Sequence, residues 1–230
     1  MDNVRVKVNQ ITFEREEPFP NERKGEVFAM VNEIMDYAIT NYEEWIVRNL
    51  ETNLDALSIP ERRELEFKHH LFWWIVYCLP LRHEKTTIFH EFIQQNWTKW
   101  KHDHTLLQVL FSWAFIAPSY YEVIEVTGER DLIIRELIGQ QTKKVTVYSE
   151  FYTPPEPGDL LSGLLLSFCD HTYSPIFDFL KIPKNLAPLF SQKLLINYSS
   201  KNERTPTDFF QKYYGFLIAA MLPYLSTSNY

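Results

Sequence analysis

The spacing of apolar residues changes near residue 118, and no other feature constrains the fold as strongly. Before this point, large apolar side chains recur every three or four residues, as in Val27, Val31 and Ile34, which places them on one face of a helix. After it, short runs rich in β-branched and aromatic residues alternate with turn sequences such as the one around Gly128. The sequence therefore predicts an α+β fold, in which a helical bundle carries an inserted small antiparallel β-meander or barrel.

The helical spacing predicts a series of helices on both sides of the β segment. They are expected from about residue 21, at about 61–79, and at 85–100, 105–116, 186–196 and 206–222. The second helix becomes apolar on every side over LFWWIVYCL and stops at Pro80, so we expect it at the centre of the core. Thr205 and Pro206 are expected to start the last helix, because Thr is a favoured N-cap and Pro fits the first turn.

The β segment is expected to form a separate small module. Its strands are predicted at 120–126, 131–134, 143–148 and 160–168, and a further strand is predicted at 3–14, where valines alternate with polar residues. Short connections favour a meander or a small barrel. The expected organisation is an N-terminal helical bundle at 1–118, a β module at 119–169, and C-terminal helices at 170–230 that pack on the bundle.

Composition narrows the function classes. The chain is 45% hydrophobic and 16% aromatic, which excludes global disorder. It has only 6 Gly and contains neither GxGxxG nor GxxxxGK[ST], so a Gly-rich phosphate loop is not expected. The net charge is -7, and residues 151–230 hold equal numbers of acidic and basic residues, so no part of the chain stands out as strongly basic. This balance argues against nucleic acid as a partner.

The cysteines and the apolar runs predict a cytoplasmic protein. Cys78 and Cys169 lie in apolar runs without CxxC or Cys/His spacing, as expected for buried, reduced thiols. The N-terminal residues lack the basic-then-apolar order of a signal peptide. The longest apolar runs are shorter than the roughly 20 residues that cross a bilayer, so no membrane association is expected.

Scattered signatures over residues 65–170 resemble the region upstream of the metal-binding motif in bacterial SEC-C-motif proteins. They are Phe72-Trp73-Trp74, Thr87-Ile88, Tyr121-Glu122-Val123, Arg135-Glu136-Leu137-Ile138-Gly139 and Gly158-Asp159. The Cys-rich zinc motif that names this family is absent, and residues 170–230 contain no Cys, so no metal ligand carries over. The resemblance implies a fold and an association with adaptors linked to protein export or translation, and it implies no activity.

No catalytic residue and no cofactor is expected. His90-Glu91 begins an HExxH pattern, but position 94 is Gln, and no GxSxG elbow is present. One metal site remains as an alternative, a metal-dependent hydrolase that uses His102, Asp103 and His104, because an extended His-x-His pair with a neighbouring carboxylate can chelate an ion. The competing interpretation is a solvated loop in which Asp103 or a Thr caps the next helix.

A second alternative is a nucleic-acid-binding module. The β module carries Arg135, Lys143 and Lys144, which could contact phosphates if they lay on one face of a barrel. This alternative ranks below a protein partner because the chain is acidic.

The aromatic residues of the last helix give the leading hypothesis. Paired rings at Phe209-Phe210 and Tyr213-Tyr214 place large side chains on more than one side of this helix. A helix in a small domain rarely buries two full sides, so we expect an exposed docking surface, whose residues are Phe210, Tyr213, Tyr214 and Phe216. Full burial between helices is the alternative. The predicted function is a non-catalytic interaction or adaptor module of a bacterial cytoplasmic protein, with another protein or a second copy as partner.

Overall fold

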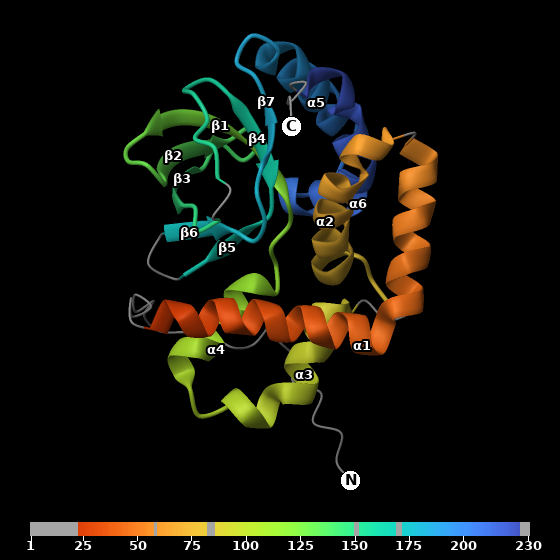
Figure 1. The fold of residues 1–230 in the computed structure, drawn as a ribbon, viewed down its shortest axis with the longest axis vertical. Coiled ribbons are helices and arrows are strands. Elements are labelled where there is room, and N and C mark those ends of the chain that lie inside the picture. The colour runs from red at the N-terminus through yellow and green to blue at the C-terminus, as the bar shows by residue number, and fades with distance from the viewer. Residues whose placement is uncertain (1–22, 58, 82–85, 150–151, 169–171, 226–230) are drawn as a thin grey trace.

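A curled sheet lies beside a set of helices (Figure 1). The computed structural model describes residues 23–57, 59–81, 86–149, 152–168 and 172–225. Within them the helices are α1 (Lys24–Leu57), α2 (Glu61–Cys78), α3 (Ile88–Trp100), α4 (His104–Trp113), α5 (Ala187–Lys201) and α6 (Pro206–Ala220), followed by a 3₁₀ turn at Leu222–Tyr224. The strands are β1 (Ser119–Val126), β2 (Asp131–Glu136), β3 (Thr142–Thr146), β4 (Leu160–Gly163), β5 (Leu165–Ser167), β6 (Thr172–Pro175) and β7 (Leu180–Ile182).

Helix α2 lies at the centre of the helical core, as the sequence predicts. It packs against α1, α3 and α6, and from Leu71 to Cys78 all of its residues except Phe72 are buried. The indole Nε1 of Trp74 donates a hydrogen bond of 2.9 Å to the backbone carbonyl of Gln211, which ties α2 to α6. A helix that is apolar on every side is stable only when other elements surround it, and here they do.

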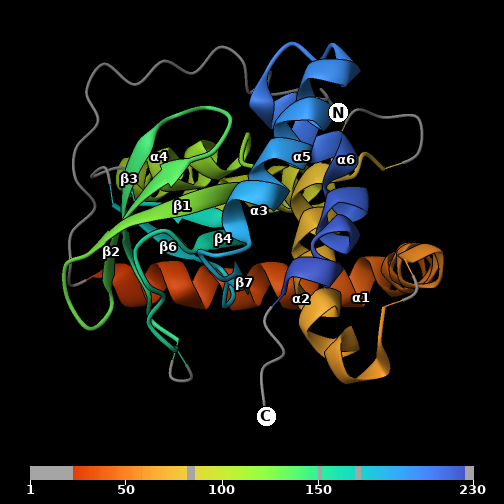
Figure 2. The ribbon, with the colours of Figure 1, turned by 90° about the horizontal axis from the view of Figure 1, so that it is seen from above.

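Helix α1 changes direction at Tyr42. The backbone there leaves helical geometry, with φ -135° and ψ 17°. The first half of α1 crosses beneath the sheet, and the second half turns up beside α2 (Figures 1 and 2). The hydroxyl of Tyr42 donates to the carboxylate of Glu91 on α3, so the bend is fixed to a neighbouring helix.

The sheet curls because two strands that follow one another in the chain pair near opposite ends of the strand order. The strand order is β5-β6-β3-β2-β1-β4-β7, and only Leu164 separates β4 from β5. Strand β4 pairs with β1 and β7, whereas β5 pairs with β6 at the opposite end of the order. A flat sheet would hold these two strands far apart, so the sheet must bend into a half-barrel.

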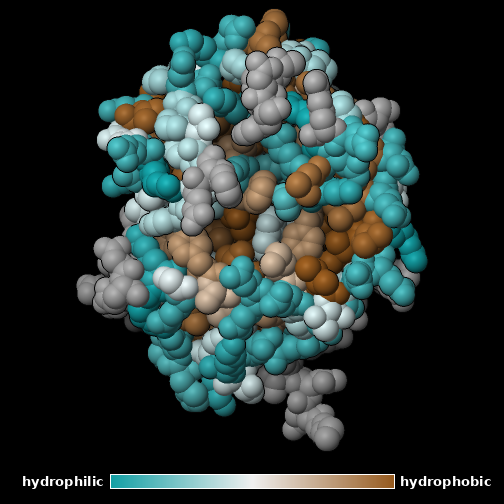
Figure 3. Space-filling view, in the orientation of Figure 1, coloured by the Kyte–Doolittle hydropathy of each residue, from teal (hydrophilic) through white to brown (hydrophobic). Residues whose placement is uncertain are grey.

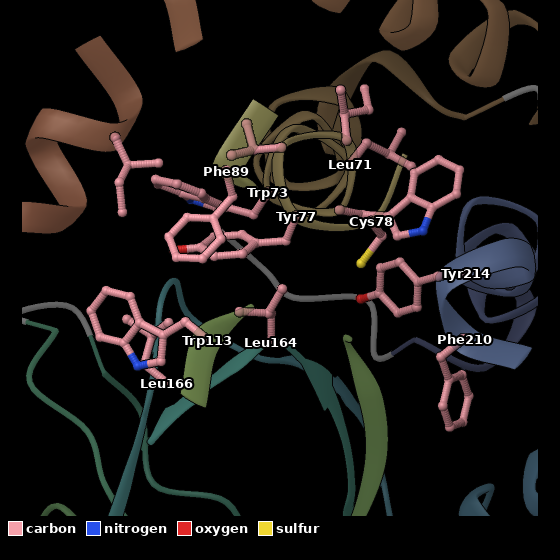
Figure 4. Close-up of a cluster of buried hydrophobic side chains, with 14 of the residues drawn as sticks. Leu71, Trp73, Tyr77, Cys78, Phe89, Trp113, Leu164, Leu166, Phe210 and Tyr214 are labelled. Atoms are coloured by element: carbon pink, nitrogen blue, oxygen red, sulfur yellow. The ribbon is translucent and has the colours of Figure 1, made fainter. Parts of the chain in front are cut away.

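The two faces of the half-barrel meet different surroundings. Since successive residues of a strand point to opposite faces, Tyr120 packs with the helices and Tyr121 points into the half-barrel. The inner face holds its own buried cluster of Tyr121, Val123, Leu132, Ile134, Val145, Val147, Leu161 and Leu165. The outer face joins the helical core, where Tyr77, Cys78 and Leu164 lie between Trp113 and Tyr214 (Figure 4).

The predicted α+β class is confirmed, and the sheet differs from its prediction in two respects. Strands β6 and β7 lie beyond residue 169, and β3 pairs with β6 in parallel, so the sheet is mixed rather than antiparallel. The predicted strand at 3–14 lies outside the described residues. Among the described helices, none is long and apolar enough to cross a membrane.

Candidate functional site

Two of the four aromatic residues predicted to form the docking surface are buried. Phe210 is 1% exposed and Tyr214 is 0% exposed, so their assignment to an exposed surface is wrong. The physical reason is that α6 packs against α1 and α2 on one side and against β1 and α5 on another. Gly215 permits this close approach, because a Cβ there would lie 2.9 Å from Cζ3 of Trp74. Sequence spacing alone does not show how many neighbours a helix has.

The other two aromatic residues lie nearer the surface. Tyr213 is half-buried, and the ammonium groups of Lys201 and Lys212 each lie 5.1 Å from the centre of its ring. Phe216 is 63% exposed, so it is the one member of the predicted set with a mostly solvent-facing ring. Thr205 starts α6 as predicted, since its hydroxyl accepts a hydrogen bond of 3.0 Å from the backbone N–H of Asp208.

The outer face of α5 is a surface that sequence analysis missed. Leu189 is 56% exposed and Ile196 is 61% exposed, and their spacing of seven residues places them on one side of the helix. Phe190 and Leu194 are buried on the other side. A shallow hollow on the outer side is lined by Gln192, Leu195, Ile196, Ser199 and Ser200. The signal was present in the sequence, because α5 has apolar residues around most of its circumference and no acidic residue.

The face of the molecule seen in Figure 1 carries apolar surface of a different kind. Figure 3 shows this surface at the centre of the view, where the sheet meets α1 and α2, surrounded by hydrophilic residues.

The predicted metal alternative is not supported. Asp103 is the N-cap of α4, where its carboxylate accepts from the backbone N–H of Leu106 at 3.0 Å, as the competing interpretation expected. The same carboxylate lies 2.5 Å from the guanidinium of Arg23, which lowers the pKa of Asp103. His102 and His104 are exposed, and no group of three potential metal ligands occurs in the described part of the chain. A carboxylate occupied in this way is a structural cap.

The predicted basic surface for nucleic acid is divided. Lys143 and Lys144 are adjacent on β3, so they point to opposite faces of the sheet, Lys143 inward and Lys144 to solvent. Arg135 forms an ion pair of 2.5 Å with Glu122 on the neighbouring strand. The three residues therefore do not form one basic patch.

The inward position of Lys143 reveals a polar pocket at the open end of the half-barrel. Lys143, Glu136 and Tyr121 line it together with Tyr173, and its volume is about 400 Å³. Tyr121 pairs with Glu136 across strands, and Lys143 pairs with Ile134, two residues before Glu136, so these side chains share the inner face. The alternation of side chains along each strand indicates the face of the sheet on which Glu136 and Lys143 lie. Only the pairing of β2 with β3 shows that both lie at the same end of that face.

A buried polar chain crosses the core between the helices and the sheet. The hydroxyl of Tyr214 lies 3.0 Å from Oγ of Ser162 and 3.4 Å from Nδ1 of His70. Burial lowers the pKa of His70 from 6.5 to about 4, and an interaction with the backbone of Asp178 opposes the lowering. His70 is thus neutral in the folded protein over a range of pH in which a free histidine binds a proton.

Acidification should therefore destabilise the protein through His70. Between pH 6.5 and about 4, the unfolded chain binds a proton at this position and the folded chain does not, so stability is fully present above this range and is lost as the pH falls. From about pH 7.5 to about pH 5, we expect the free energy of unfolding to fall by about 2 kcal/mol from this group. Burial also lowers the pKa values of His69 and His90, which act in the same direction.

Urea unfolding at the two pH values measures this loss. A His70→Gln variant should lose about 2 kcal/mol less on acidification than the unmodified protein. Equal losses in the unmodified protein and in His70→Gln would contradict the assignment to His70.

Comparisons of the chain with protein-family models, curated proteins and solved structures gave no match. The resemblance to SEC-C-motif proteins therefore stays a prediction.

Proposed function

We propose that this chain is a non-catalytic interaction module that associates with a second copy of itself through the outer face of α5. The observation that carries the proposal is the presence of apolar residues on two opposite sides of this helix. Phe190 and Leu194 pack into the core, whereas Leu189 and Ile196 face water. A helix at the surface of a monomer has one apolar side as a rule, so a second apolar side favours a partner.

The charge of the chain favours this face for self-association. Two copies with a net charge of -7 each repel one another, so they can approach only where the surface carries little negative charge. Helix α5 has no acidic residue, and both of its lysines turn onto rings. Lys193 lies 5.0 Å from the ring centre of Tyr224, and Lys201 lies 5.1 Å from that of Tyr213. The residues that form its outer face, among them Leu189, Gln192 and Ile196, are themselves uncharged.

The distribution of side-chain sizes along α5 suits a two-fold pair. A symmetric dimer brings the same surface of each copy together, and two α5 helices related by a two-fold axis perpendicular to them run antiparallel. With α5 centred on the axis, Leu189 lies level with Ser199 of the second copy, and Ile196 lies level with its Gln192. Large residues then face smaller or flexible polar ones, as ridge-into-groove packing requires.

A cytoplasmic location belongs to the same proposal. Cys78 is a free thiol that is buried among apolar groups, and its Sγ lies 3.7 Å from the backbone carbonyl of Ile116. Burial raises the pKa of this thiol, so it is unreactive and behaves as a small apolar residue. A reduced structural cysteine of this kind is typical of proteins in reducing compartments.

Light scattering during size-exclusion chromatography tests the proposal. The unmodified protein should elute with twice the monomer mass of 27.5 kDa, and the double variant Leu189→Glu, Ile196→Glu should elute as a monomer. Two glutamates in each copy would place like charges and unpaired carboxylates in the contact, which costs more than the apolar contact contributes.

A matched control separates this interface from general surface stickiness. Leu65 on α2 is 68% exposed, so Leu65→Glu places a glutamate at another apolar surface position and should leave the dimer intact. A monomer in the unmodified protein at every accessible concentration would overturn the proposal. Dissociation of Leu65→Glu to the same extent as the α5 variant would overturn it as well.

A further inference from the structure

The open end of the half-barrel holds one acidic and one basic side chain on the same inner face. The interior of the half-barrel is filled by apolar residues such as Val145 and Ile134. Lys143 lies two residues before Val145 on β3, and Glu136 lies two residues after Ile134 on β2. Both therefore continue the inner face beyond its apolar part, where the pocket of about 400 Å³ opens.

Neighbouring groups hold both charged side chains in place. The ammonium group of Lys143 lies 4.5 Å from the ring centre of Tyr173, a cation–π distance. The carboxylate of Glu136 lies over Gly139 in the turn that joins β2 to β3, and a Cβ at position 139 would be 2.6 Å from Oε2 of Glu136. Glycine thus leaves the space that this carboxylate occupies.

The pocket is partly shielded from water, which strengthens charge interactions inside it. Burial lowers the pKa of Lys143, and the nearby Glu136 opposes this shift. Tyr121, at the floor of the pocket, is 2% exposed, and burial raises the pKa of its hydroxyl, with a smaller contribution from Glu136. A charged group of a ligand would therefore meet its counterpart in surroundings of lower dielectric constant than bulk water.

The remaining walls come from the helical part of the molecule. Ser112 and Phe115 lie at the end of α4 and just beyond it, and Pro206 and Thr207 begin α6. The ring of Phe115 is 56% exposed, so the rim offers an apolar surface beside the charged pair. A pocket of this volume is at the small end of the range of about 300–1,000 Å³ for ligand sites.

We propose that this pocket binds a free α-amino acid, with the ligand carboxylate at Lys143, the ligand ammonium at Glu136 and the ligand side chain against Phe115. The charges decide the class of ligand. A simple anion would gain from Lys143 but would be repelled by Glu136, and a simple cation would meet the reverse. A small zwitterion satisfies both. This binding is independent of self-association through α5.

Thermal-shift and calorimetric titrations with each of the proteinogenic amino acids test the proposal. At least one amino acid should raise the melting temperature of the unmodified protein. Its N-acetyl derivative and its carboxamide, each of which lacks one of the two charges, should bind about tenfold to hundredfold more weakly, the loss expected for a charge-assisted hydrogen bond. Inorganic phosphate serves as the simple anion and should not bind measurably.

Substitutions assign the two ends of the ligand. Lys143→Gln and Glu136→Gln should each weaken binding of the amino acid by a similar factor, and Lys144→Gln should not, because Lys144 is on the same strand but faces solvent. The derivatives test the unmodified protein, so the proposal remains falsifiable if a variant fails to fold. Absence of binding by every amino acid would overturn it. So would binding of inorganic phosphate as tight as that of any amino acid, or equal binding by Lys143→Gln and the unmodified protein.

Discussion

Replacing Trp113 with Ala should lower the free energy of unfolding by about 3–5 kcal/mol, the range for truncating a fully buried Trp. Trp113 is 1% exposed and ends α4, where its ring lies beside Leu166 in the core between helices and sheet (Figure 4). Its indole Nε1 donates a hydrogen bond of 2.9 Å to the backbone carbonyl of Ser167 on β5. Truncation would leave a cavity and remove this hydrogen bond at the same place, and urea unfolding monitored by circular dichroism measures the combined loss.

A second substitution at this position separates the two contributions. Trp113→Phe retains an aromatic ring but removes the N–H donor to Ser167, so it should lose about 1–3 kcal/mol, less than the alanine variant. A loss below about 1 kcal/mol in Trp113→Ala would show that α4 does not depend on this contact with the sheet. Equal losses in the two variants would assign the effect to the groups that Phe also lacks, the N–H and the outer part of the indole ring.

The helices were predictable because their signals are local. Three-to-four spacing marked α1, and the apolar second half of α2 predicted the centre of the core, where Tyr77 and Cys78 are indeed buried. The start of α6 at Thr205 followed from the N-cap preference of one residue. Such features depend on a few consecutive side chains and the backbone groups beside them, so a sequence carries them without knowledge of the fold.

The closure of the sheet was not predictable, because it depends on pairing between distant segments. Alternation predicts that a segment is a strand but does not choose its neighbour. Residues 160–168 were expected to form one strand, whereas the chain bends at Leu164 and the two parts pair at opposite ends of the sheet. The parallel pairing of β3 with β6 likewise brings Val145 to Tyr173 across a long stretch of chain. The direction of such a pair is set by packing of the whole sheet.

The candidate sites show the same limit. The pocket needs Glu136 and Lys143 at one end of one face, and the register of β2 against β3 decides this. Predicting the outer face of α5 requires knowing which side of the helix other elements cover. The presence of Phe190 in the sequence does not show this. Exposure is a property of the assembled molecule, and for this reason the sequence misassigned Phe210 and Tyr214.

Two substitutions on α6 should therefore have very different effects although both remove a phenylalanine ring. Phe210→Ala should lower the free energy of unfolding by about 3–5 kcal/mol, since Phe210 is buried against Phe209 and Tyr120 with ring centres 5.3 and 5.8 Å away. Phe216→Ala should change it by less than about 0.5 kcal/mol, because most of this ring already faces water.

Parallel urea titrations of the two variants measure this contrast, and the unmodified protein supplies the reference. The comparison is well matched because both residues lie in α6 and alanine favours a helix equally at either position, so helix propensity cancels. A large loss for Phe216→Ala and a small one for Phe210→Ala would mean that α6 is rotated about its axis relative to this structure. The aromatic docking surface predicted from sequence would then regain Phe210 and lose Phe216.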